Sequence, residues 1–479
     1  MSEPLANRLA EYACSLRFED LPGPVVHEAK RRFIDSFATA VGAMDAEAYS
    51  IAKRCALRVQ SASGASLLGG GRSSPEWATF VNGLLIRYLD YNDTYLSLEP
   101  AHPSDNLAAV LAVGEMAHAT GQDSITAAVL AYEIQCRLCD AASLRKHGWD
   151  HVTYGAISSA IAACKLLRLD AVKTTHAIGL AGVANTALRQ TRAGELSMWK
   201  GCAFANTARN GVFAALLAAE GMTGPAPIFE GSLGFMKLLT GPFELPPLGG
   251  ELVRARKVSE SSGPAESSAY HSPLTTHHAP NFMITKTYIK FWPAEYHSQS
   301  AIDAALQLRP EIGDIRNISA IDIHTFDAAV DIIANEPEKW RPSTRETADH
   351  SLPYCTAVAL ADGDVTLAQF DPKRFTDPML LDLVAKVKVH RDPALTARYP
   401  NGIPNRLTVT LNGGRTLMKE VEFPRGHAHN PMTDAEVERK FRVLVEPRYG
   451  KESADRILAA CWGLERLRRV EDLMRLLVQ

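Results

Sequence analysis

Apolar residues recur at helical spacing through almost all of the first 265 residues of the chain. Five segments show this pattern most clearly: 26–44, 124–145, 156–167, 170–185 and 205–221. Several of them are rich in Ala and Gly, whose small side chains let the axes of neighbouring helices approach closely. The pattern predicts a large all-α domain over residues 1–265, packed as a bundle.

Strand patterns begin only in the second half of the chain. Three segments alternate apolar and polar residues in the manner of strands: 317–326, 383–392 and a hairpin at 405–423. The hairpin contains Asn412-Gly413, which we expect to supply the positive φ angles of its tight turn. A helical segment at 300–310 lies close to these strands and indicates an α+β arrangement.

A change in composition predicts where the parts of the chain meet. Residues 257–281 are dense in Ser, Pro and His and predict a linker or a long loop. We therefore place a smaller α+β lid domain at 266–428. Residues 429–479 return to helical spacing and are expected to pack back onto the first domain. The predicted fold class is multi-domain: a large all-α helical domain with a smaller α+β lid domain.

The overall charge and the lengths of the apolar segments exclude several partners. The net charge of -3 gives no attraction to nucleic acid or to an anionic membrane. No stretch approaches the ~18 apolar residues of a membrane span, and the N-terminus lacks the layout of a secretory signal. The eight Cys are scattered and fit reduced core thiols. We expect a cytoplasmic protein.

The stretch DYNDTYLSLEPAHPSDN gathers acids and a histidine directly before an Ala-rich helical segment. Ser104 or Asp105 would cap that helix, which places His102 beside free backbone N–H groups that favour an anion. Asp90 and Asp93 lie close enough in sequence to orient a His or to accept a proton. Taken by itself, the stretch also fits a helix cap within a surface loop.

Two further stretches carry basic groups around helix starts. His151, in KHGWDHVTYG, also precedes an Ala-rich helical segment. The next helix start is surrounded by four cations: Arg189, Arg192, Lys200 and Arg209. Cations close to a helix N-terminus suit a polyanionic small molecule. The alternatives are a capping His and ordinary surface charge.

The second domain contributes two stretches of its own. Lys290, Glu295 and His297 bracket the apolar FWP of IKFWPAEYHSQSA, which opens this domain and would face a cleft between domains. His350 and Tyr354 lie in DHSLPY before another apolar helix, where the Tyr hydroxyl would donate a proton. A strand-to-helix turn and a buried, hydrogen-bonded Tyr are the structural alternatives.

Residues that could bind a metal do not form a recognised motif. His277-His278 and the HAH at 427–429 have no obvious third ligand. Cys136 and Cys139 lie inside a helical pattern, without the further Cys ligands that an iron–sulfur cluster needs. We expect no metal and no cofactor.

In this order along the chain, the stretches resemble the MmgE/PrpD family, and the resemblance covers nearly the whole chain. DYNDTYLSLEPAHPSDN and IKFWPAEYHSQSA are its most specific motifs. The resemblance implies a homodimer with a helical domain, an α+β lid and no metal or iron–sulfur requirement. It implies a small tricarboxylate substrate. The implied reaction is dehydration of 2-methylcitrate to 2-methyl-cis-aconitate, with citrate as a further substrate, in the methylcitrate cycle of propionate catabolism.

The same resemblance assigns functional positions in this sequence. The catalytic residues that it implies are Asp93, His102, His151 and Tyr354. The substrate-binding residues are Lys200, Lys290, Arg209 and Glu295. The two His would supply the base and the acid, in either order, while the Asp orients a His. The two Lys would clamp carboxylates, and the Tyr would assist proton transfer from the lid.

Glu295 distinguishes between reactions of the family. In the family's decarboxylases a His occupies this position, whereas PAEYH is similar to the dehydratase form. This difference favours dehydration. A cis-aconitate decarboxylase and a polycarboxylate epimerase or isomerase are the alternatives within the family. A non-catalytic helical scaffold is an alternative of another class, but a scaffold needs no cluster of charged loops at helix starts.

Overall fold

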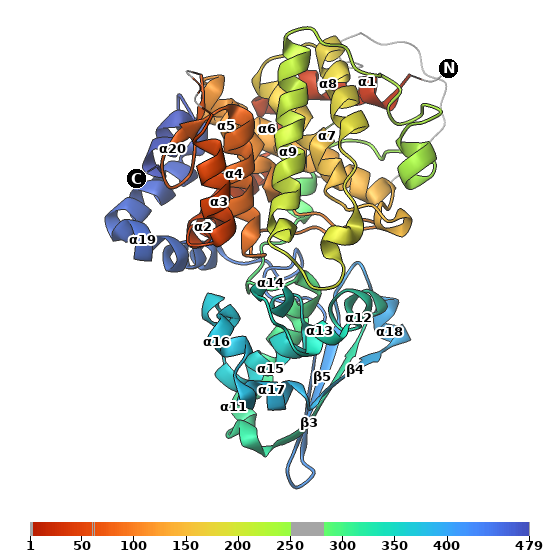
Figure 1. Ribbon diagram of the computed structural model, residues 1–479, viewed down its shortest axis with the longest axis vertical. Helices are drawn as coiled ribbons and strands as arrows, with labels where there is room; N and C mark the ends of the chain where they lie inside the picture. Colours follow the sequence, from red (N-terminus) through yellow and green to blue (C-terminus); the bar gives the residue numbers. More distant parts are fainter. Residues whose placement is uncertain (1–2, 60, 62, 251–281, 479) are drawn as a thin grey trace, which may run out of the picture.

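The computed structural model describes residues 3–59, 61, 63–250 and 282–478 (Figure 1). Figure 1 shows an upper lobe made of helices and a lower lobe that contains a sheet. The predicted linker at 257–281 and the predicted boundary after residue 265 lie outside the described residues. In the described part of the chain, no helix combines the length and the apolar character needed to cross a membrane.

The helical lobe confirms the helical segments predicted from spacing. Its helices in the first half of the chain are α1 (Leu5–Ser15), α2 (Gly23–Gly42), α3 (Glu47–Ala56), α4 (Pro75–Tyr88), α5 (Leu107–Met116), α6 (Gly121–Ala141), α7 (Thr153–Leu166), α8 (Ala171–Ala184) and α9 (Trp199–Ala219). A short sheet pairs β1 (Ala65–Ser66) with β2 (Arg72–Ser73). A Cβ at Gly211 of α9 would lie 2.5 Å from the carbonyl oxygen of Ala156 on α7. Only a residue without a side chain allows these helices to approach so closely.

The C-terminal helices lie on the helical lobe. α19 (Asp434–Trp462) packs along α2, and α20 (Glu471–Leu476) packs against α5. Figure 1 shows both in blue beside the red and orange N-terminal helices. Val437, Phe441 and Val445 are fully buried, and their spacing of four residues places them on one face of α19. Residues from both ends of the chain therefore share one core.

The small lobe holds a mixed four-stranded sheet in the order β4-β3-β5-β6. Its strands are β3 (Ile318–Thr325), β4 (Val387–Arg391), β5 (Asn405–Leu411) and β6 (Thr416–Val421). β3 pairs in parallel with β4 and antiparallel with β5, and β5 pairs antiparallel with β6. The predicted strand at 317–326 and the hairpin are confirmed, whereas the strand predicted at 383–392 covers only β4, because residues 383 and 384 end a helix.

Helices cover the small lobe's sheet and connect its strands. They are α11 (Gln299–Ile312), α12 (Asp327–Ile333), α13 (Pro337–Trp340), α14 (Arg345–Ala348), α15 (Leu352–Asp362), α16 (Pro372–Phe375), α17 (Pro378–Val384) and α18 (Pro393–Thr396). α11 packs on β5 and β6, while α15 packs on α11 and β4. Alternate residues of β5 are buried, as expected for a strand with one covered face.

The hairpin turn corrects one local prediction. The positive φ angles belong to Gly413 and Gly414, not to Asn412. Glycine adopts such angles without the strain that a side chain brings. The N–H of Gly414 donates to the carbonyl of Leu411, so Asn412 and Gly413 are the central residues of the turn, as predicted.

The start of α5 corrects a second prediction. Residues Pro103–Asn106 form a 3-10 helix, η2, and α5 follows at Leu107 without a side-chain cap. The hydroxyl oxygen of Ser104 accepts a hydrogen bond from the side-chain amide of Asn92 over 2.8 Å. The carboxylate of Asp105 is also engaged, since it accepts a hydrogen bond from an Asn side chain. Neither predicted cap residue is therefore free to cap the helix.

The chain enters the small lobe near residue 290. Phe282, Met283 and Ile289 are buried in the core of the helical lobe, whereas Trp292 and Ala294 belong to the core of the small lobe. The boundary predicted after residue 265 lies outside the described residues and stays a prediction. The first three side chains contribute to the helical core because burial removes their apolar surface from water.

His427 lies in the small lobe with its ring against Tyr288. Their ring centroids are 4.5 Å apart, and burial and nearby His429 lower the pKa of His427 from 6.5 to about 4. Between these pH values the unfolded chain binds a proton that the folded chain does not, so stability falls as the pH falls. We expect His427→Phe to lessen the loss of unfolding free energy between pH 6.5 and about pH 4, measured by urea unfolding. An equal loss in both proteins would contradict this.

Candidate active site

A cavity of about 90 Å³ lies where the two lobes meet. Its cationic side chains are Arg87, Arg145, Arg189, Arg192 and Lys339. Its imidazoles are His102, His151, His297 and His350, and its carboxylates are Asp90, Glu295, Asp331 and Glu336. So many cations and imidazoles around one small cavity favour a ligand that carries several carboxylates.

Helix ends supply most of the groups in and around this cavity. Arg87 lies in the last turn of α4, and Lys200 lies in the first turn of α9. His102 comes directly before η2, and His151 and His350 lie two residues before α7 and α15. Because helix N-termini present free N–H groups, several of them around one cavity add to its attraction for anions.

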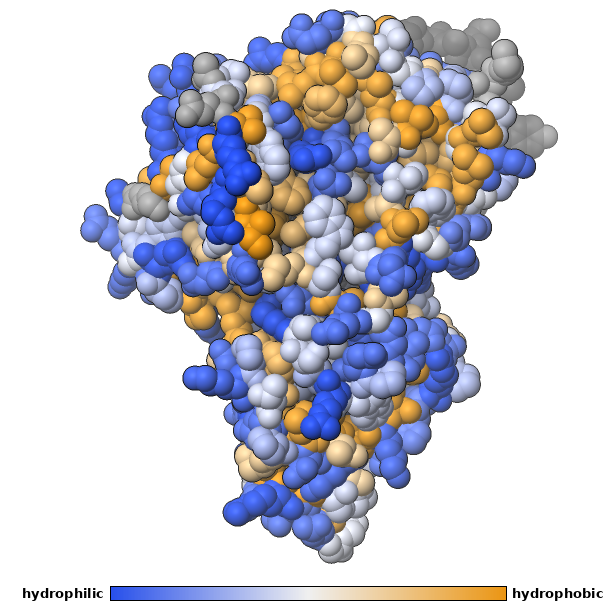
Figure 2. All heavy atoms as spheres, viewed as in Figure 1, coloured by the Kyte–Doolittle hydropathy of each residue, from blue (hydrophilic) through white to orange (hydrophobic). Residues whose placement is uncertain are grey.

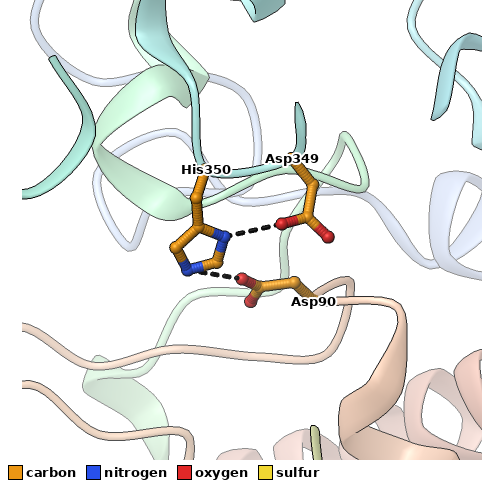
Figure 3. A group of neighbouring side chains, drawn as sticks. All are labelled: Asp90, Asp349 and His350. Carbon is orange, nitrogen blue, oxygen red and sulfur yellow. Dashed lines mark hydrogen bonds and ion pairs between the residues drawn. The ribbon is translucent and has the colours of Figure 1, made fainter. Parts of the chain in front are cut away.

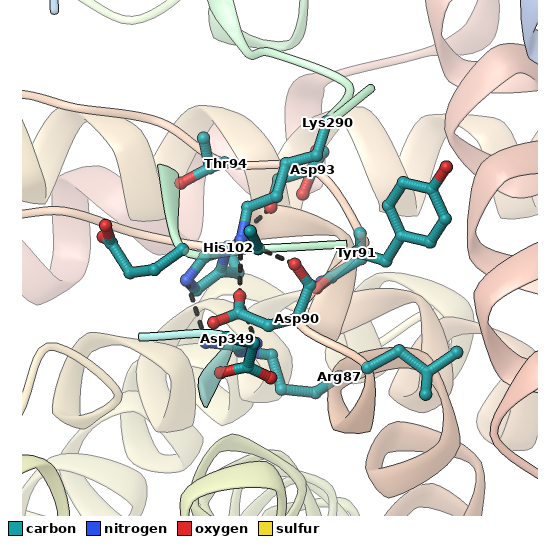
Figure 4. A network of polar contacts seen from close by, with 12 residues as sticks. Arg87, Asp90, Tyr91, Asp93, Thr94, His102, Lys290 and Asp349 are labelled. Carbon is teal, nitrogen blue, oxygen red and sulfur yellow. Dashed lines mark hydrogen bonds and ion pairs between the residues drawn. The ribbon is translucent and has the colours of Figure 1, made fainter. Parts of the chain in front are cut away.

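The buried carboxylate of Asp90 contacts three cations, of which Figure 4 labels Arg87 and Lys290. Its oxygens lie 2.7 Å from Nη1 of Arg87 and 3.2 Å from Nζ of Lys200. They also pair with Nζ of Lys290, which in addition donates to the Asp90 carbonyl over 2.9 Å. Burial raises the pKa of the Asp90 carboxyl, but the three cations outweigh burial and hold that pKa well below its usual value. Asp90 is therefore an anion that holds the cations in place.

His350 bridges two buried carboxylates (Figure 3). Its Nδ1 lies 2.6 Å from Oδ1 of Asp349, and its Nε2 lies 3.3 Å from Oδ2 of Asp90. Burial and the charge of Lys200 lower the pKa of His350 to about 4. A ring that is neutral near pH 7 has one N–H, which Nδ1 donates to Asp349, and the ring lies between this small-lobe residue and the loop after α4.

Asp90, Asp349 and His350 also have the spacing of a metal site, since their ligand atoms lie within 4.8 Å of one another. Lys200 pairs with both carboxylates, at 3.2 Å from Asp90 and 3.0 Å from Asp349. Ammonium and guanidinium groups therefore already occupy the positions around these oxygens that a metal ion would need. The donor set favours internal ion pairs, and the expectation of no metal stays a prediction.

His102 is held as a neutral ring. Its Nδ1 donates to the carbonyl oxygen of Asp93 over 2.8 Å, because a carbonyl can only accept. Its Nε2 accepts from Nη2 of Arg87 over 3.1 Å. Burial, Arg87 and Lys290 hold the pKa of His102 well below its usual value. The ring therefore fixes the Arg87 guanidinium rather than offering a proton.

His151 belongs to a carboxylate–imidazole pair on the helical lobe. Its Nδ1 lies 2.8 Å from Oδ1 of Asp150, whose other oxygen accepts from Nε of Arg192 over 3.0 Å. Burial raises the pKa of the Asp150 carboxyl, but Arg192 and His151 outweigh burial and lower that pKa below its usual value. Asp150 is therefore an anion. Within the described residues, Nε2 of His151 is buried and has no hydrogen-bond partner. This nitrogen is oriented by Asp150 and free to take a proton.

A second carboxylate–imidazole pair lies on the small lobe. Oε1 of Glu295 is 2.7 Å from Nδ1 of His297, and Oε2 accepts from the backbone N–H of His297 over 2.8 Å. Burial raises the pKa of Glu295, but the neighbouring His297 outweighs it and lowers that pKa. The other ring nitrogen of His297 lies 3.4 Å from the hydroxyl of Tyr399. The cavity thus has one such pair from each lobe.

The structure brings together five of the eight residues that the sequence predicted for the site. They are His102, His151, Lys200, Lys290 and Glu295. Asp93 contacts His102 only through its carbonyl oxygen. Its carboxylate accepts instead from the hydroxyl of Tyr132 over 2.7 Å and lies 3.4 Å from Nε of Arg32. The carboxylate of Asp93 therefore stabilises the loop rather than facing the cavity.

Arg209 and Tyr354 lie away from the cavity. The guanidinium of Arg209 donates to Asn210 and lies over the ring of Trp77, 5.7 Å from its centroid. The hydroxyl of Tyr354 donates to the carbonyl of Gln369, and its ring is fully buried. Each side chain has a structural role where it lies.

We expect Tyr354→Phe to leave turnover unchanged. The hydroxyl donates to a backbone carbonyl, so its loss should lower the free energy of unfolding by about 1 kcal/mol. Steady-state kinetics and urea unfolding of the purified variant check both parts. A tenfold fall in turnover with normal folding would instead support a catalytic role for this hydroxyl.

Sequence reasoning missed several groups that the structure adds. Arg87 lies three residues before Asp90, a spacing that pairs side chains on a helix, and this signal was present in the sequence. Asp150 directly precedes His151 and was also visible. Lys339, from the distant helix α13, gave no signal because only the fold brings it to the cavity.

Comparisons with known proteins identify the family of the chain. The MmgE/PrpD N-terminal domain matches residues 7–247, and the MmgE/PrpD C-terminal domain matches residues 292–464. The chain is 30% identical to a 2-methylcitrate dehydratase of Cupriavidus necator over 419 residues, 82% of this chain and 80% of that protein. It is 28% identical to the 2-methylcitrate dehydratase of Escherichia coli K12 over 418 residues, 83% and 80% of the two chains. It is also 30% identical to the alkylcitrate dehydratase phiI of a fungus over 401 residues, 77% and 72% of the two chains.

Proposed function

Since the chain belongs to the MmgE/PrpD family and is a hydro-lyase of the 2-methylcitrate dehydratase type, we propose that it converts 2-methylcitrate to 2-methyl-cis-aconitate. The observation that carries the proposal is a cation-lined cavity with one carboxylate–imidazole pair from each lobe. Eliminating water needs a base on one carbon and an acid at the neighbouring hydroxyl. Two oriented imidazoles supply both.

The cations of the cavity bind the three carboxylates of the substrate. Burial and neighbouring Arg145 lower the pKa of Arg189, which marks two like charges held close together. A substrate carboxylate between them would relieve this repulsion and form charge-assisted hydrogen bonds. Lys339 is buried on the opposite lobe and can hold a second carboxylate. Binding energy from these groups fixes the acid before any bond breaks.

His151 acts as the base in this proposal. Its free Nε2 takes the proton from the carbon beside a carboxylate, and the electron pair of that C–H bond forms the new double bond. Asp150 stabilises the resulting imidazolium through Nδ1. Negative charge that develops on the adjacent carboxylate is stabilised by the fixed cations of the cavity.

His297 acts as the acid. As the C–O bond breaks, the protonated ring gives its Nε2 proton to the departing hydroxyl, which leaves as water. Glu295 stabilises the protonated ring before the transfer, through the 2.7 Å contact at Nδ1. A His in place of Glu295, as the family's decarboxylases have, would remove this carboxylate. The Glu therefore favours dehydration over decarboxylation.

An apolar part of the cavity is suited to the methyl group of 2-methylcitrate. Leu96, Pro100 and Ile332 line it among the charged groups. We expect Leu96→Ala to narrow the preference for 2-methylcitrate over citrate by about tenfold, because one methyl contact is worth about 1–3 kcal/mol. The ratio of the two kcat/KM values measures this. An unchanged ratio would place the methyl group elsewhere.

The test of the proposed function offers chelator-treated protein three acids separately: 2-methylcitrate, citrate and cis-aconitate. Ultraviolet absorbance follows the conjugated double bond, and NMR identifies the products. New absorbance from 2-methylcitrate is the expected result. Loss of cis-aconitate with release of carbon dioxide would mean a decarboxylase, and a changed stereocentre without water loss would mean an epimerase.

The homodimer and the cytoplasmic location stay predictions. Light scattering of the purified protein tests the homodimer.

A further inference from the structure

Lys440 of α19 is buried, and its ammonium group has three hydrogen-bond acceptors and lies 3.7 Å from the centroid of the Tyr91 ring. Nζ lies 2.6 Å from Oδ1 of the buried Asp35 on α2. It also donates to the carbonyl oxygens of Tyr91, over 2.7 Å, and of Lys290, over 2.9 Å. An ammonium has three N–H donors, so each donor is matched by one acceptor.

The two carbonyls belong to the segments that carry the central ion pair of the site. Tyr91 directly follows Asp90, and Lys290 pairs with Asp90 through its side chain. The Tyr91 hydroxyl donates to the carbonyl of Phe291 over 2.9 Å and links the same segments again. Segments 90–91 and 290–291 are thus joined on one side by the Asp90–Lys290 pair and on the other by Lys440.

We propose that the Asp35–Lys440 pair is a positioning element that holds Asp90 and Lys290 in the arrangement needed for turnover. This inference rests on the proposed function, which supplies the reaction. Neither Asp35 nor Lys440 lines the catalytic cavity. They act through the backbone of the two segments. A misplacement of about 1 Å at reacting groups can lower a rate by about 100-fold.

The Asp35–Lys440 pair has an electrostatic cost that allows folding and positioning to be separated. Burial raises the pKa of Asp35 and lowers the pKa of Lys440, so burial disfavours both charges. Replacing both partners of a buried ion pair with apolar side chains is often neutral for stability, whereas removing one partner is damaging. The double variant Asp35→Leu/Lys440→Met should therefore fold but lose the contacts to both carbonyls.

A second cavity offers a direct test of the ammonium group. Lys440, Tyr91 and Arg439 line this cavity, which has a volume of about 330 Å³. In Lys440→Ala, propylammonium can enter through it and restore an N–H donor where Nζ lay. Tetramethylammonium carries the same charge without any N–H group and should not restore activity. Arg439→Ala is the matched control, since no hydrogen bond joins this side chain to either segment within the described residues.

The expected result is a folded double variant whose kcat is about 100-fold below wild type. We also expect Lys440→Ala to regain activity with propylammonium alone and Arg439→Ala to match wild type. A folded double variant with wild-type kcat would overturn the proposal. If the double variant does not fold, the rescue of Lys440→Ala by the two salts is the test. The proposal would be overturned if propylammonium restored no activity to folded Lys440→Ala, or if both salts restored it equally. Wild-type protein that converts none of the acids would contradict the proposed function instead.

Discussion

The variant His151→Asn is expected to lose turnover by about 10²–10⁴-fold, the usual contribution of a general base. In the part of the chain that the structure describes, Nε2 of His151 is buried and has no hydrogen-bond partner, and Asp150 holds the opposite nitrogen at 2.8 Å. Asparagine keeps a polar side chain of similar reach but cannot accept a proton near pH 7. Binding should persist because the cations of the cavity remain.

Two measurements distinguish loss of the base from loss of binding. Tricarballylate, a tricarboxylate without the hydroxyl, should bind the variant with nearly wild-type affinity in calorimetry. NMR in deuterated water should show wild-type protein exchanging the abstracted proton of the substrate, and the variant should not exchange it. His118→Asn is the matched control, because His118 is exposed and already has a positive φ that Asn tolerates. Exchange at the wild-type rate in His151→Asn would assign the base to another group.

Helical spacing is a local property, which is why the helices could be predicted from the sequence. The segment 26–44 lies largely within α2 (Gly23–Gly42), and 124–145 lies largely within α6 (Gly121–Ala141). The boundaries differ by two to four residues because caps and turns set them. The position near residue 290 where the chain passes between the lobes depends on which core buries each apolar side chain. The spacing of apolar residues along the chain does not predict this assignment.

The sequence identified many residues of the site, but not the directions in which their side chains point. Arg209 lies nine residues beyond Lys200 on α9, about two and a half turns, so the two side chains leave the helix on opposite sides. A motif records that both are present, not that only one faces the cavity. Tyr354 likewise matched a motif, but its hydroxyl donates to the carbonyl of Gln369, 15 residues later in the chain, and does not face the cavity.

The choice between Asp90 and Asp93 shows the same limit. Both acids lie in DYNDTY, three residues apart. Asp90 adopts a φ of 50°, which reverses the chain locally and turns its carboxylate towards the cations. The carboxylate of Asp93 is thereby left to the N–H of Ser104. This backbone angle is a property of the folded chain, so the motif that led us to name Asp93 could not show that Asp90 would meet the cations.

Asp90→Asn is expected to lower the free energy of unfolding by about 3–5 kcal/mol and to abolish measurable turnover, because it leaves buried charges uncompensated. Asn tolerates the same positive φ, so backbone strain does not contribute. The change removes one negative charge from among Arg87, Lys200 and Lys290. Urea unfolding and the dehydration assay measure the two losses. Asp45→Asn, at an exposed ion pair, is the control and should change stability by less than about 0.5 kcal/mol.

A second substitution separates stability from catalysis at the same position. In Asp90→Asn/Lys290→Met one buried cation is removed together with the anion that it pairs with, so part of the lost stability should return. Turnover should not return, because the cations that remain still lack the carboxylate that orients them towards the substrate. Recovery of both together would mean that Asp90 serves the fold alone. Recovery of stability without turnover would assign to the Asp90–Lys290 pair the arrangement of charge on which the elimination depends.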